Sequence, residues 1–131
     1  MNEIQRKQYV FSSGSLNLPD MVLHKLENGY LYTHPQLNVV EAVSKNNKHI
    51  WILGNAFCMD AEKTVQEDVA AWEGEDLASL TRYWTGRWVL ICEGTLITDA
   101  CGLMAAFYKA TQDGWIVSSS LAVLATVCGV K

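Results

Sequence analysis

The chain has 131 residues, a formal charge of −4 and a hydrophobic fraction of one half, which suits a single domain (residues 1–131) with a substantial core. No basic stripe is present, so we expect no nucleic-acid partner. The sequence also lacks an apolar run of about 18 residues and a leading apolar segment, so it predicts no membrane span and, by default, a cytoplasmic protein.

The first half of the sequence predicts β-strands, because short apolar runs alternate with turn residues. We expect strands at residues 9–12, 21–26, 30–33, 37–43 and 49–53. Asn28-Gly29 is a strong hairpin signal, since both residues tolerate positive φ. Gly54-Asn55 is expected to end the last of these strands.

After residue 60 the spacing of apolar residues changes to that of helices. The residues at helical spacing are Val65, Val69 and Trp72 in a first segment, and Leu77, Leu80, Thr81 and Trp84 in a second. This spacing predicts two short amphipathic helices. Asp60 can cap the first helix, and Gly86 is the expected end of the second.

The remaining residues again predict strands, followed by one helix. Strands are expected at 88–92, 95–98, 105–109 and 115–118, and a helix over 121–128 that Ser119 or Ser120 can cap. The runs 50–53 and 88–92 are apolar on both sides, which is typical of strands covered on both faces. With antiparallel pairing, this predicts an α+β fold: an αββα-type sandwich of two stacked, mostly antiparallel sheets with few outer helices.

The chain contains four cysteines: Cys58, Cys92, Cys101 and Cys128. No two of them have C-x-x-C spacing, and the three histidines are scattered, so no zinc-binding pattern is present. We therefore expect reduced and mostly buried cysteines, no metal and no cofactor.

The second half contains four motifs in a suggestive order: Gly86–Ile91, Thr98–Leu103, Ala106–Tyr108 and Trp115–Leu124. They resemble the class II glutaminase domain of asparagine synthetase and its relatives, β-lactam synthetase and the lasso-peptide cyclases. In that family, a glycine-initiated strand is followed by an Asp-x-x-Gly turn, an aromatic pair and a serine-rich strand that enters a helix. The resemblance covers roughly Tyr9 to Leu124 and implies an N-terminal-nucleophile hydrolase fold.

The resemblance implies a catalytic cysteine as the first residue of the mature chain, with its own α-amine as the base. Here the chain begins with methionine and asparagine, and the nucleophile position falls near Lys7 or Gln8, within a polar extension, 1–8. Neither side chain is a suitable nucleophile. Internal cleavage that exposes Ser12 or Ser13 is the remaining alternative.

The resemblance also implies a substrate cleft in which most of the family's substrate-binding residues are replaced. Gln36 occupies the position of the arginine that holds the substrate carboxylate, and an amide cannot replace that charge-assisted pairing. Leu53-Gly54 replaces the Asn-Gly pair of the oxyanion hole, so only the backbone N–H of Gly54 is expected to remain as a donor. Asn55 adjoins this pair. Asp76 matches an aspartate that contacts the substrate amine, although a helix N-terminal carboxylate is the stronger interpretation.

These losses predict a non-catalytic glutaminase-like domain that acts as a scaffold or interaction module. Its expected partner is an asparagine-synthetase-like, ATP-dependent amide-forming enzyme, either in the same polypeptide or as a separate subunit; a homodimer is also compatible with the sequence. One alternative is a serine- or cysteine-dependent amidohydrolase, in which Cys58, or less readily Cys101, pairs with His24, His34 or His49. Another is a module that binds a small ligand, such as an amino acid, in the old cleft.

Overall fold

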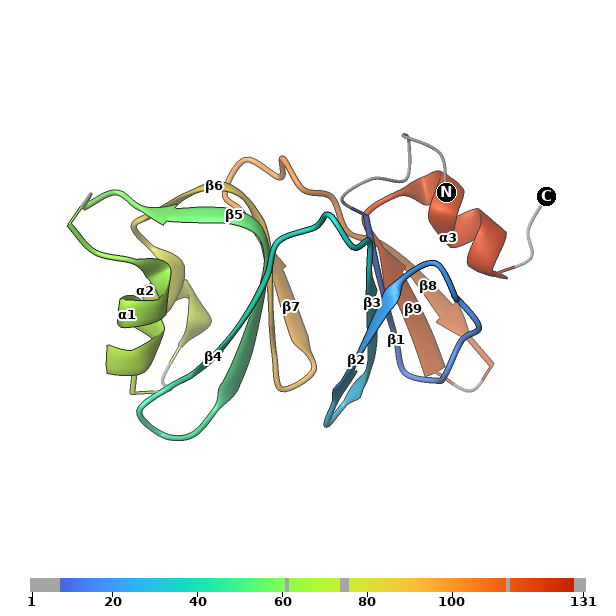
Figure 1. Ribbon diagram of the computed structural model, residues 1–131, viewed down its shortest axis with the longest axis horizontal. Coiled ribbons are helices and arrows are strands. Elements are labelled where there is room, and N and C mark those ends of the chain that lie inside the picture. Colours follow the sequence, from blue (N-terminus) through green and yellow to red (C-terminus); the bar gives the residue numbers. More distant parts are fainter. Residues whose placement is uncertain (1–7, 61, 74–75, 113, 129–131) are drawn as a thin grey trace. The chain divides into compact units, whose positions relative to one another are not determined.

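The computed structural model describes residues 8–60, 62–73, 76–112 and 114–128. They form two compact units, one from the residues up to Leu37 and from Ala105 onward, the other from Asn38 to Met104. Each unit contains one antiparallel sheet (Figure 1). The predicted α+β class, with two mostly antiparallel sheets and few helices, is therefore confirmed. None of the helices in the described ranges is long and apolar enough to cross a membrane.

The first unit contains a five-stranded sheet in the order β2-β3-β1-β9-β8. Its strands are β1 (Tyr9–Ser12), β2 (Val22–Leu26), β3 (Gly29–Thr33), β8 (Phe107–Thr111) and β9 (Gly114–Ser118). The helix α3 (Leu121–Cys128) follows β9, and its Val123 and Leu124 pack against Val10 of β1. The Ser120 Oγ accepts a hydrogen bond from the Val123 N–H at 3.3 Å, so one of the two predicted caps is confirmed.

The second unit contains a four-stranded sheet in the order β4-β5-β6-β7. Its strands are β4 (Val39–Val43), β5 (His49–Cys58), β6 (Trp84–Cys92) and β7 (Thr95–Thr98). Two short helices, α1 (Val65–Ala71) and α2 (Leu77–Thr81), connect β5 to β6. Val69 and Leu80 of these helices belong to the same buried cluster as Ile52 and Trp88 of the sheet. The helices therefore cover one face of this sheet.

The central strands β5 and β6 are buried on both faces, as their uninterrupted apolar runs predict. Ile50 and Leu90 belong to the cluster beneath the helices. Leu53 and Val89, which lie opposite each other across the β5–β6 pair and on the other face, have no solvent exposure. Burial of both sets explains why these strands do not alternate with polar residues.

The boundaries of β5 and β6 differ from those predicted at two glycines. Gly54 does not end β5, which continues to Cys58 and pairs with β6 without a break in register. Gly86 lies within β6 rather than at the end of a helix, and Trp84 is the first residue of that strand. Gly86 has φ +108°, and an added Cβ would lie 2.2 Å from the Asn55 carbonyl oxygen, so glycine permits a close approach of the two strands.

Two local predictions were also wrong in detail. The β2–β3 hairpin forms, but Leu26 pairs with Gly29, so Glu27 and Asn28 make the turn, and positive φ is found instead at Asn47 and Glu93 in other turns. The cap of α1 is not Asp60, whose carboxylate accepts a hydrogen bond from the Glu62 N–H within a turn.

The N-cap of α1 is Thr64, which forms a capping box with Glu67. The Thr64 Oγ1 accepts a hydrogen bond from the Glu67 N–H at 3.2 Å, and the Glu67 carboxylate accepts one from the Thr64 N–H at 3.4 Å. The sequence contains this signal as the Thr-x-x-Glu spacing of Thr64 and Glu67. The spacing therefore could have located the start of the helix.

Candidate functional site

Two of the predicted cleft residues, Gly54 and Asn55, lie together in β5 and line a hollow of about 270 Å³. Asn38 and Gln66 line the same hollow, and the Asn38 Nδ2 donates a hydrogen bond to the Asn55 Oδ1 at 2.6 Å. Three carboxamide side chains thus gather at one place. Asn38 and Gln66 could not be predicted as site residues, because neither belongs to a motif and only the fold brings them beside β5.

The Gly54 amide, expected to remain as an oxyanion donor, has a backbone partner. Its N–H donates to the carbonyl oxygen of Asn38 at 2.9 Å. The preceding Leu53 side chain is fully buried and has no donor. An oxyanion hole needs donors that point at the reacting oxygen and have no other partner. The Leu53-Gly54 pair does not provide such donors.

The other two predicted cleft residues have local structural roles. Asp76 is the N-cap of α2, and its Oδ1 accepts a hydrogen bond from the Ala78 N–H at 2.9 Å. This is the helix-terminus role that was the stronger interpretation. Gln36 follows β3 in the first unit, is exposed, and donates its backbone N–H to the His34 Nδ1 at 3.0 Å. Neither residue lines the hollow beside Gly54.

Cys58 ends β5 and has a partner that disfavours its thiolate. Its Sγ donates a hydrogen bond to the Asp68 Oδ2 at 3.1 Å, and the Trp84 Nε1 donates to the same oxygen at 2.9 Å. Burial, this hydrogen bond and the charge of Asp68 raise the pKa of Cys58 to about 11. A thiol held by a carboxylate is protonated at neutral pH, the opposite of the setting that a nucleophilic cysteine needs.

The histidines have partners other than cysteine. His24 Nε2 lies 3.1 Å from the Thr33 Oγ1, and His49 Nδ1 lies 3.0 Å from a carboxylate oxygen of Glu41. All four cysteines are free, but only Cys92 is buried, so the prediction of mostly buried cysteines was wrong. Across the described ranges, no three His, Cys, Asp or Glu side chains are close enough to hold a metal ion.

The predicted nucleophile position lies at the start of β1, where Lys7 and the rest of the extension up to it are outside the described residues. Gln8 is described, and its carbonyl oxygen accepts a hydrogen bond from the His34 N–H at 3.0 Å. Its side-chain oxygen accepts one from the Ser119 Oγ, which also accepts the Tyr9 N–H at 3.0 Å. These bonds anchor the first strand between its two neighbours. The alternative nucleophiles Ser12 and Ser13 lie at and just after the end of β1.

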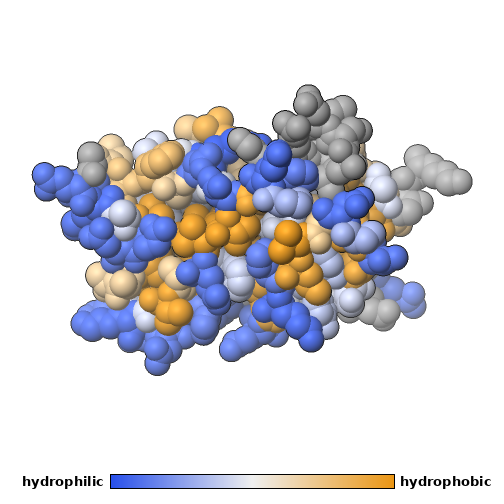
Figure 2. Space-filling model, in the orientation of Figure 1, coloured by the Kyte–Doolittle hydropathy of each residue, from blue (hydrophilic) through white to orange (hydrophobic). Residues whose placement is uncertain are grey.

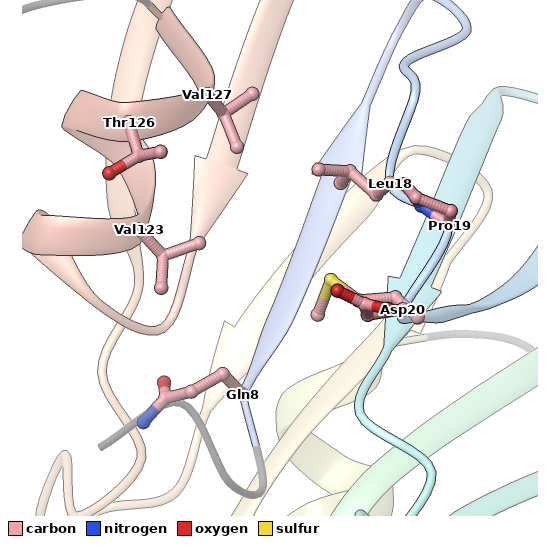
Figure 3. A pocket seen from close by; sticks show the side chains of 8 residues that line it. Gln8, Leu18, Pro19, Asp20, Val123, Thr126 and Val127 are labelled. Atoms are coloured by element: carbon pink, nitrogen blue, oxygen red, sulfur yellow. The ribbon is translucent and has the colours of Figure 1, made fainter. Parts of the chain in front are cut away.

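A small pocket of about 160 Å³ adjoins Gln8 in the first unit. Figure 3 shows Val123 and Val127 of α3 on one side, Leu18 and Pro19 on the other, and Gln8 at one end. The lining is mostly apolar and the volume is below the range of about 300–1,000 Å³ that is usual for ligand sites. Gaps of this kind are consistent with a helix that is packed on a sheet through few side chains.

The Asp-x-x-Gly turn of the resemblance is built around the carboxylate of Asp99, which is 4 % exposed. It accepts hydrogen bonds from four backbone N–H groups, those of Trp88, Cys101, Leu103 and Met104. Burial by itself would raise the pKa of Asp99, but these hydrogen bonds hold it below its ordinary value. The carboxylate therefore fixes the chain that follows β7.

Large hydrophobic side chains are exposed in both units. They include Phe57 (59 %), Met59 (70 %) and Tyr83 (64 %) at one end of β5 and β6. On the face drawn in Figure 2, hydrophobic residues form several separate patches among hydrophilic ones.

Comparisons of the chain with known protein families, characterised proteins and solved structures find no match.

Proposed function

We propose that this chain is a non-catalytic glutaminase-like domain that acts in the cytoplasm as a scaffold or interaction module for an asparagine-synthetase-like, ATP-dependent amide-forming enzyme. The observation that carries the proposal is the Gly54 amide, which is the last expected oxyanion donor and is bonded to Asn38. Loss of one such donor typically costs about 2.7–4 kcal/mol of transition-state stabilisation. A cleft without either donor is poorly suited to hydrolysing an amide.

The parts that carry the resemblance support a structural role. Asp99 uses its carboxylate entirely on backbone N–H groups, and Ser119 and Ser120 of the serine-rich strand end cap α3 or hold the start of β1. Residues that support the frame are thus present, whereas the residues expected to act on glutamine are replaced or engaged. This pattern is expected for a domain that has kept its fold and lost its chemistry.

The proposal is tested by measuring ammonia release from glutamine and complex formation in parallel. We expect ammonia release equal to that of buffer, with an active class II glutaminase as the positive control. We also expect the chain to form a stoichiometric complex with a purified asparagine-synthetase-like enzyme from the same organism, measured by sedimentation. Turnover of glutamine would contradict the non-catalytic part of the proposal, and absence of a complex with that enzyme would contradict the scaffold part.

A further inference from the structure

The strand β5 is longer than the strand β4 beside it. The β4–β5 pairing runs from Val43↔His49 to Val39↔Leu53, and one further backbone bond joins Gly54 to Asn38. On the other side, β6 pairs with β5 as far as Cys58↔Trp84. The last four residues of β5, 55–58, therefore have a neighbouring strand on one side only within the described part of the chain.

The register shows which backbone groups face this open edge. The N–H and C=O of Trp88 bond to Asp99 at 3.1 and 3.0 Å, on the side of β6 away from β5. Trp88 lies opposite Gly54, and in an antiparallel pair the bonded and non-bonded residues alternate. Because the register is unbroken to Cys58, the N–H and C=O groups of Ala56 and Cys58 point away from β6.

Ala56 and Cys58 thus present backbone donors and acceptors at a repeat of about 6.8 Å along the edge. The hydrogen bonds of the described residues do not supply a backbone partner for either of them. An unpaired row of this kind is a template for another strand. Its natural complement is an extended peptide backbone, which repeats its own N–H and C=O groups at the same interval.

A hollow adjoins the last residues of β5, and the start of α1 borders it. One cavity of about 450 Å³ is lined by Ala56, Phe57 and Cys58 on one side and by Lys63, Thr64 and Gln66 on the other. The cavity of about 270 Å³ beside Asn38 shares Ala56, Phe57 and Gln66 with it. An added strand needs only about 4.8 Å between its axis and that of β5. The hollow is therefore placed to receive one extended segment.

We propose that an extended, basic segment of a partner protein binds along residues 55–58 as an additional strand of this sheet. The charge of the adjoining segment, 59–68, favours this occupant: it contains four carboxylates and one lysine. A second copy of the chain would bring two such acidic segments together, whereas lysine or arginine side chains would complement one. The exposed Phe57 and Met59 offer apolar contacts for alternate side chains of the segment. This proposal does not depend on the partner being a synthetase.

The test uses a capped eight-residue peptide that alternates valine with lysine, titrated to millimolar concentration against the whole chain. Backbone amide NMR signals of Ala56 and Cys58 are expected to shift in a saturable way and to exchange more slowly with solvent. Two N-methylated forms of the peptide distinguish strand pairing from charge attraction. One form is methylated at every second amide, and the other is methylated at the remaining amides. One form should bind at least roughly tenfold more weakly and the other should bind normally. Equal binding of both forms, or shifts confined to other residues, would overturn the proposal.

Variants of the protein provide a second measurement. Ala56→Pro removes one edge N–H without removing a bond to β6 and should weaken binding at least about tenfold. Glu62→Lys should weaken it severalfold, whereas Glu27→Lys, in the β2–β3 turn, should not. If Ala56→Pro does not fold, the two methylated peptides decide the question on the unchanged chain. Concentration-dependent dimerisation of the free chain that protects the Ala56 amide would instead identify a second copy as the occupant and overturn the proposal.

Discussion

Two regions of the second unit lie on opposite sides of β6 and differ in whether their polar backbone groups have hydrogen-bond partners. At the Asp99 turn, four N–H groups converge on one buried carboxylate. At the end of β5, Ala56 and Cys58 direct their backbone groups toward a hollow. A buried polar group costs free energy unless it is hydrogen-bonded within the protein, whereas a half-exposed one can bond to water until a partner binds. The turn therefore contributes to stability, and the strand end is where binding is expected.

The largest expected effect comes from removing the carboxylate of the turn. Asp99→Ala leaves four backbone N–H groups without their acceptor, and two of them, those of Trp88 and Met104, belong to buried residues. We expect the free energy of unfolding at pH 7 to fall by about 3 kcal/mol or more, measured by urea denaturation. Asp60→Ala removes a carboxylate that accepts one bond in an exposed turn and should cost less than about 1 kcal/mol.

The same carboxylate predicts an acid dependence. Because the pKa of Asp99 is lowered in the folded state, its contribution is fully present above the unfolded pKa of about 3.9 and is lost as the pH falls through the folded pKa. Stability of the natural chain should thus decrease in this range more than that of Asp99→Asn. Parallel pH curves for the two proteins would show that the carboxylate charge does not stabilise the turn.

A third prediction concerns the backbone at the start of the open edge. Gly54 has φ +91°, and an added Cβ would lie 2.4 Å from the Arg87 carbonyl oxygen. Gly54→Ala should therefore lower the free energy of unfolding by about 2 kcal/mol through strain and steric overlap. Gly14→Ala is the matched control, because an added Cβ there meets no atom within 4 Å. Equal stability of the two variants would show that β5 does not approach β6 as described.

Most of the strands could be predicted from the sequence because their signals are local. The run Tyr9–Ser12 is an observed strand with the predicted bounds, and the predicted break between residues 92 and 95 is the turn between β6 and β7. The helix over 121–128 also has its predicted bounds. Alternation, turn residues and helical spacing depend on neighbours in the chain, so one sequence is sufficient to locate them.

Gly54 and Asn55 were predicted to lie in the candidate site, but its other features depend on contacts between distant residues and could not be predicted. Glycine is typical of strand and helix ends, so the sequence places Gly54 and Gly86 there. Their positions within strands are explained only by the close approach of β5 and β6, which leaves no room for a Cβ. The hydrogen bond from the Gly54 N–H to the Asn38 carbonyl oxygen could be predicted only if the start of β4 and its pairing with β5 were known. The open edge follows from the unequal lengths of two paired strands, which no local pattern records.

The last prediction concerns the reactivity of the Cys58 thiol at the end of β5, and it involves the smallest expected change in stability. With a pKa of about 11, Cys58 should react with iodoacetamide at pH 7.5 on the order of 100-fold more slowly than an ordinary exposed thiol. Peptide mass spectrometry of the labelled chain measures this against the exposed Cys101. Asp68→Ala removes the hydrogen-bond acceptor and the charge but not the burial, so labelling of Cys58 should accelerate while its pKa stays above that of a free thiol. A thiol that donates to a carboxylate is protonated at pH 7.5 and should react slowly. Faster labelling of Cys58 than of Cys101 in the natural chain would therefore contradict this prediction and favour the thiol-dependent hydrolase.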